Sequence, residues 1–103
     1  MSTDRETRFR KMAEEFPDSP MGHFSLGKLL LDARRYAEAV EPLERATRLQ
    51  PDYAAALVAL GEAHLGAGQK DPARAALERA RTAAAAQGHD GLAEEISARL
   101  AAL

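Results

Sequence analysis

The chain has 103 residues, which suffices for one domain, and it carries a formal net charge of -2 and no cysteine. This charge gives no electrostatic reason to expect nucleic acid or an anionic membrane as a partner, and without cysteine neither a disulfide nor a thiolate metal site can form. Residues 1–11 are charged and lack the apolar stretch of a secretory signal, and the longest apolar run, Ala54–Leu60, is too short to span a membrane. We therefore expect a soluble, cytoplasmic protein.

Alanine is abundant and β-branched residues are few, which favours helices over strands. Pro17 is expected to end a first helix, because a helix does not readily continue across proline. Ser19 is a typical N-cap with Pro20 at the first helical position, and Asp71–Pro72 is a second start signal. Asp90 is expected to cap the last helix. The predicted helices cover residues 3–16, 20–33, 36–49, 52–67, 71–87 and 90–103.

Pro42 lies inside the third predicted helix, where it removes the hydrogen bond to the carbonyl of Glu38, at a typical cost of ~3 kcal/mol. The apolar spacing of Val40, Leu43 and Ala46 continues past it. We therefore expect a local bend in this helix and not a break.

The last predicted helix is amphipathic, with one apolar stripe at helical spacing. Its other face carries Glu94, Glu95 and Arg99 and is expected to meet water. The stripe is suited to cover the end of a core, although an amphipathic tail that binds something else would have the same pattern. The stripe consists of Leu92, Ile96, Leu100 and Leu103.

The sequence repeats itself after 34 residues. Residues 43–46, Leu-Glu-Arg-Ala, recur as residues 77–80, and Leu26–Gly27 recurs as Leu60–Gly61. The same shift carries Phe9 onto Leu43, so the N-terminal segment takes part in the pattern.

This period, with a Leu-Gly pair in one helix and spaced small and large apolar residues in the next, resembles the tetratricopeptide repeat family. The resemblance covers nearly the whole chain. The departures are His23 and Leu57 where the family usually has an aromatic residue, and Ala85 where it has a closing proline. The matching residues are Leu26, Gly27, Tyr36, Ala39, Leu43, Ala46 and Pro51 in the first repeat, and Leu60, Gly61, Ala73, Leu77 and Ala80 in the second.

The resemblance implies an all-α fold: a short right-handed α-solenoid of antiparallel helix pairs, with about six helices in a single domain, residues 1–103. In this scheme residues 3–16 form the second half of a repeat. Residues 20–53 and 54–87 form two full repeats, and residues 90–103 form a capping helix.

In proteins of this family the first helices of successive repeats line a concave surface, and the resemblance therefore implies a groove for a peptide or an amphipathic helix. The groove would be mainly apolar, with one charge of each sign. The same residues could instead be core, covered by flanking helices or by a second copy of the chain. The expected groove residues are Met21, Phe24, Lys28, Leu31, Ala55, Val58, Glu62 and Leu65.

Catalytic and metal-binding patterns are weak. The histidines His23, His64 and His89 lack the three- or four-residue spacing of a ligand pair, and His64 is expected to be buried, neutral and hydrogen-bonded. Adjacent Glu14–Glu15 point in different directions and do not converge as acid and base. Lys28 is the single basic residue expected in the groove, which argues against the grip on a C-terminal carboxylate known in the family. We expect no enzyme activity, no cofactor and no metal.

Two functions stay open at this point. The first is an adaptor that binds a protein or peptide partner in the groove. The second is a self-assembling structural module, such as a homodimer, or a fragment of a larger repeat scaffold, because two full repeats are few for an independent solenoid. A nucleic acid or membrane partner is not expected.

Overall fold

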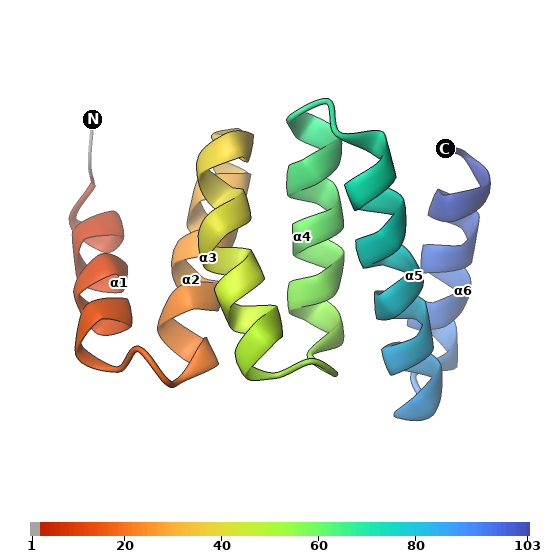
Figure 1. Cartoon of the computed structure of the whole chain (residues 1–103), viewed down its shortest axis with the longest axis horizontal. Helices are drawn as coiled ribbons and strands as arrows, with labels where there is room; N and C mark the ends of the chain where they lie inside the picture. Colours follow the sequence, from red (N-terminus) through yellow and green to blue (C-terminus); the bar gives the residue numbers. More distant parts are fainter. Residues whose placement is uncertain (1–2) are drawn as a thin grey trace.

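The computed structural model describes residues 3–103, and in that part of the chain it contains six helices and no strand. Successive helices run antiparallel to one another (Figure 1). The predicted all-α fold is confirmed. The helices are α1 (Asp4–Glu15), α2 (Pro20–Asp32), α3 (Tyr36–Leu49), α4 (Ala54–Gly66), α5 (Lys70–Ala86) and α6 (Asp90–Ala101).

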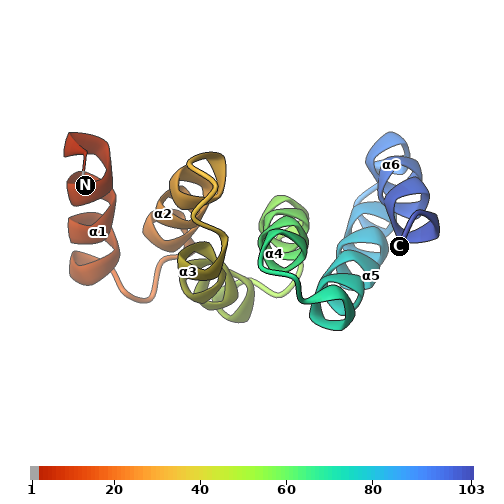
Figure 2. The same ribbon diagram turned by 90° about the horizontal axis from the view of Figure 1, so that it is seen from above.

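The helices follow a shallow arc, which Figure 2 shows from above. Helices α2 and α4 lie on the inner side of the arc, α3 and α5 on the outer side, and α1 and α6 at the two ends. Helix α2 pairs with α3 and α4 pairs with α5, and α3 packs on α4 between the two pairs. This is the predicted α-solenoid of stacked helix pairs.

Paired helices approach closely at the Leu-Gly pairs of the repeat. A Cβ added at Gly27 would lie 2.5 Å from Cγ of Leu43, and one added at Gly61 would lie 2.8 Å from Cγ of Leu77. Both leucines are completely buried. The 34-residue recurrence therefore marks the hairpin contacts of both repeats.

Two apolar clusters form the core: one extends from α2 to α5, and the other joins α4, α5 and α6. The C-terminal cluster contains Leu57 of α4, Leu77 of α5 and Ile96 of α6, which is 1% exposed. Helix α6 thus covers this end of the core with its apolar stripe. Helix α3 runs without interruption through Pro42, which is buried.

One expected helix cap, Asp90, is wrong, and the helix that Asp71–Pro72 was expected to start begins one residue earlier. Helix α5 begins at Lys70 after Gln69, and α6 begins at Asp90 after His89, and neither preceding residue makes a side-chain capping bond. Asp71 and Asp90 lie within the first turn instead, where a carboxylate is favoured by the helix dipole. Ser19 does cap α2 as predicted, because its hydroxyl accepts a hydrogen bond from the amide of Met21.

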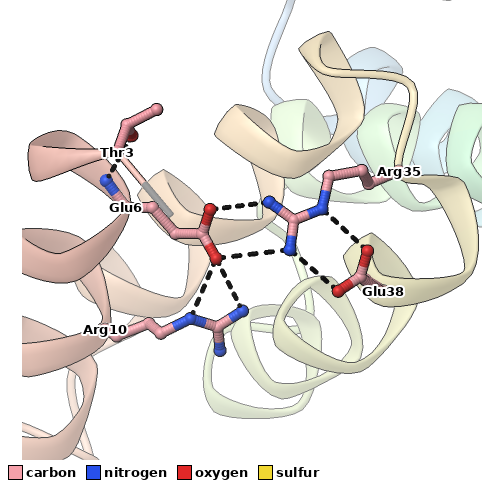
Figure 3. A network of polar contacts seen from close by, with 5 residues as sticks. All are labelled: Thr3, Glu6, Arg10, Arg35 and Glu38. Carbon is pink, nitrogen blue, oxygen red and sulfur yellow. Dashed lines mark hydrogen bonds and ion pairs between the residues drawn. The ribbon is translucent and has the colours of Figure 1, made fainter. Parts of the chain in front are cut away.

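A buried carboxylate attaches α1 to the rest of the molecule (Figure 3). Glu6 is only 3% exposed, and its Oε1 accepts a hydrogen bond of 2.6 Å from Nη1 of Arg35 in the turn between α2 and α3. Arg10, one turn further along α1, donates to Oε2 of the same carboxylate at 3.0 Å, and Arg35 also donates to Glu38 at 2.7 Å. Every carboxylate in this network faces a guanidinium, so the buried charge of Glu6 is compensated.

Candidate functional site

The inner face of the arc contains a pocket between α2, α4 and α6. Its volume is about 250 Å³. The pocket is lined mainly by apolar side chains, with one positive and one negative residue. The lining residues are Phe24 and Lys28 of α2, Ala55, Val58, Ala59 and Glu62 of α4, and Leu92 of α6.

The side chains around this pocket are held in place by local contacts. The ring of Phe24 packs against the ring of Tyr53 with 4.9 Å between centroids. Lys28 Nζ lies 3.3 Å from Oδ1 of Asp32, one turn along α2, and Glu62 forms an ion pair with Arg99 of α6. The charges of Lys28 and Glu62 are therefore already partnered, and the pocket presents an apolar floor with a neutralised rim.

A second pocket of about 380 Å³ adjoins the first and shares Glu62 with it. It is more polar, since it contains Asp32, Arg34 and Arg99 beside Leu31 and Leu65. The two pockets together form an inner groove that follows α4 from Ala55 to Leu65.

The structure brings most of the expected groove residues together. Five of them line the first pocket: Phe24, Lys28, Ala55, Val58 and Glu62. Leu31 and Leu65 line the second pocket, but Leu31 is only 6% exposed and offers little surface. Met21 is 62% exposed and lines neither pocket.

Among the groove residues missed in the sequence are Leu92 and Arg99, which both belong to α6. Arg99 is exposed, as expected for the face that meets water, but its guanidinium also pairs with Glu62 across the groove. The signal was present: the 34-residue shift carries Val58 onto Leu92 and Leu65 onto Arg99. The apolar stripe of α6 by itself predicts only a cap, whereas the 34-residue shift also places Leu92 and Arg99 in the groove.

Two of the three histidines are buried and lie within hydrogen-bonding distance of a partner. His64 is buried and its Nδ1 lies 2.9 Å from Oε1 of Gln69, and the buried His23 has its Nε2 3.0 Å from the carbonyl of Pro17. Residues 3–103 contain no group of three or more His, Cys, Asp or Glu side chains that could hold a metal ion. No helix in this part of the chain is both long and apolar enough to cross a membrane.

Stacked antiparallel helix pairs with an open inner face define a helical-repeat scaffold, a class of protein that binds partners over an extended surface. A sequence profile described as tetratricopeptide repeat matches residues 7–48 and 24–89, and the chain belongs to the tetratricopeptide repeat family. The two matches overlap, so the division into repeats at residues 20–53 and 54–87 stays a prediction. Tetratricopeptide repeats are generally protein–protein interaction modules and non-catalytic scaffolds.

A solved structure with the same architecture is the solution structure of protein BPP2914 from Bordetella parapertussis. Its TM-score is 0.78 at 27% sequence identity, over 97% of this chain and 86% of that one. The curated proteins contain no match to the chain.

Proposed function

We propose that the protein is an adaptor that binds a peptide or an amphipathic helix of another protein in the inner groove. The observation that carries this proposal is the apolar pocket between α2, α4 and α6, which no side chain of residues 3–103 fills. Apolar side chains that line an open concave surface gain free energy when a partner removes them from water.

The size of the pocket suits one large apolar side chain. Pockets for small molecules usually measure ~300–1,000 Å³ and enclose most of the ligand, whereas this pocket holds about 250 Å³ and is open to one side. An anchor residue of a partner helix, such as leucine or phenylalanine, would fill it against Phe24, Val58 and Leu92.

The two pockets also set the spacing of the partner's anchors. Val58 and Leu65 lie seven residues apart on α4, which corresponds to about 10 Å along a helix axis. A helical partner would meet both pockets with residues two turns apart, and an extended partner in the polyproline II conformation with residues three apart. This spacing is the sequence pattern that we expect in bound peptides.

The proposal is tested by selecting binders from a random peptide library and measuring their affinity for two variants. Ala55→Arg places a long side chain in the pocket from an exposed position on α4, and should weaken binding at least tenfold. Ala75→Arg makes the same change at an exposed position on α5, on the outer side of the arc, and should leave binding unchanged. If the peptides bind both variants as tightly as the wild type, the groove is not their binding site and the proposal is refuted.

A further inference from the structure

The turn between α2 and α3 contains an arginine in a backbone conformation that favours glycine. Arg34 has a φ of 60°, and among residues 3–103 it is the only residue other than glycine with a positive φ. The 34-residue shift carries it onto Gly68, in the turn between α4 and α5, where φ is 78°. Glycine adopts this left-handed conformation readily, whereas a Cβ makes it unfavourable. The second repeat thus has the residue that the backbone favours, and the first repeat does not.

The two turns are closed by the same hydrogen bonds. The amide of Arg34 donates to the carbonyl of Leu31 at 2.9 Å, and the amide of Gly68 donates to the carbonyl of Leu65 at 3.0 Å. In each turn the next amide donates to the carbonyl five residues earlier, at 2.9 Å and 2.8 Å. Closing the turn therefore does not require an arginine. Residues in such unfavourable conformations are frequent at ligand-binding sites.

The Arg34 side chain adds a positive charge to the inner groove. It is exposed and lines the second pocket. Three cations and two carboxylates line the two pockets, and both carboxylates are paired, Asp32 with Lys28 and Glu62 with Arg99. Within residues 3–103, no carboxylate lies at ion-pairing distance from Arg34. The charge that remains in the groove is therefore positive, and it lies where α2 and α4 end.

We infer that the segment bound in the groove carries an aspartate or glutamate side chain, which pairs with Arg34 beside the anchor in the second pocket. This inference rests on the proposed function of the groove. A guanidinium binds a carboxylate through two parallel hydrogen bonds, which fix the orientation of the pair. Because Arg34 lies at one end of the groove, it also distinguishes the two ends of a bound segment.

The position of Arg34 determines where the acidic residue stands in the partner. It should flank the anchor that fills the second pocket and lie outside the pair of anchors. Between the anchors the segment passes Lys28 and Glu62, whose charges are already paired. In peptides selected on the wild type, aspartate and glutamate should therefore be enriched beyond one anchor only. Selected peptides without this one-sided enrichment would overturn the inference.

A double-mutant cycle tests the contact itself. A selected peptide and its variant with the matching amide in place of the acidic residue are measured against wild type and Arg34→Gly. Both peptides have amidated C-termini, so that a side chain must supply the carboxylate. Arg34→Gly should weaken binding of the acidic peptide about threefold to fivefold, as for an exposed ion pair, and leave the amide peptide unchanged. The difference should shrink in about 1 M salt, because exposed charges are screened.

Arg34→Gly separates binding from folding. The variant acquires the glycine of the second turn, so its melting temperature should be kept or raised. The control for net charge is Arg81→Gln, at an exposed position of α5 that lines neither pocket of the groove, and it should bind both peptides as the wild type does. If Ala55→Arg weakens binding while Arg34→Gly affects both peptides equally, the groove is the binding site but this inference is wrong. If Ala55→Arg has no effect, both are wrong.

Discussion

At the scale of single residues, the buried carboxylate of Glu6 is the feature that depends most on its partners. The Arg35 guanidinium holds the pKa of Glu6 below its ordinary value, and Arg10 acts in the same direction, although burial of the carboxylate opposes both. Arg35 lowers the pKa of Glu38 as well, and the two carboxylates raise the pKa of Arg35. The network links α1 to the turn between α2 and α3.

Replacing Glu6 by glutamine should lower the melting temperature more than replacing Glu38 by glutamine. The amide cannot compensate the charges of Arg10 and Arg35, which were positioned around a buried anion. Glu38 is about half exposed, so water replaces much of what its substitution removes. Thermal unfolding followed by circular dichroism measures both. Equal decreases in melting temperature for the two variants would show that the burial of Glu6 does not add to stability.

The contribution of Glu6 should also depend on pH. A carboxyl group whose pKa is lowered by folding stabilises the folded state at pH values above its unfolded pKa, and this stabilisation is lost as the pH falls through the folded pKa. The difference in melting temperature between wild type and Glu6→Gln should therefore shrink between about pH 5 and pH 3. A difference that stays constant over this range would contradict the lowered pKa.

This network could not be read from helical spacing. Glu41 and Arg45, like Glu44 and Arg48, stand at the four-residue spacing of helical ion pairs, but neither pair is among the ion pairs of residues 3–103. Such exposed pairs contribute only ~0.3 kcal/mol, so other side-chain conformations compete with them. The pair that attaches α1, Glu6–Arg35, joins residues 29 positions apart, and no local pattern marks it.

At the scale of helices, the contact of α1 with α2 depends on Gly22. A Cβ added there would lie 2.8 Å from the backbone nitrogen of Ala13, which cannot move aside as a side chain could. Gly27 and Gly61 were recognisable in the sequence because their contact occurs twice. Gly22 has Ala56 at the equivalent place, so its role had no recurrence to reveal it.

Gly22→Ala and Gly91→Ala should therefore change stability in opposite directions. The first forces α1 and α2 apart, with an expected loss of ~1–3 kcal/mol, as for other overpacked contacts. The second adds a methyl group where nothing lies within 4 Å, and should stabilise α6 by ~0.5–1 kcal/mol through helix propensity. Urea denaturation gives both values, and a neutral Gly22→Ala would refute the close approach.

At the scale of the whole molecule, the 34-residue recurrence predicted the helix pairs, and the resemblance to the tetratricopeptide repeat family implied the part of the groove that α2 and α4 contribute. The contribution of α6 to the groove was missed because this helix lacks the Leu-Gly pair. The 34-residue shift carries Leu60–Gly61 of α4 onto Glu94–Glu95 of α6. Without the hairpin signature α6 reads as a cap, and only its packing shows that it also closes the inner face.

If the groove is the binding site, peptide binding should change the surroundings of residues on the inner face of the arc only. Nuclear magnetic resonance can test this residue by residue. A selected peptide added to uniformly ¹⁵N-labelled protein should shift the amide signals of α2, α4 and α6 around Phe24, Val58 and Leu92. The amides on the outer side of α3 and α5 should stay unchanged. Shifts confined to α3 and α5 would contradict the account, because the partner would then bind the outer side of the arc.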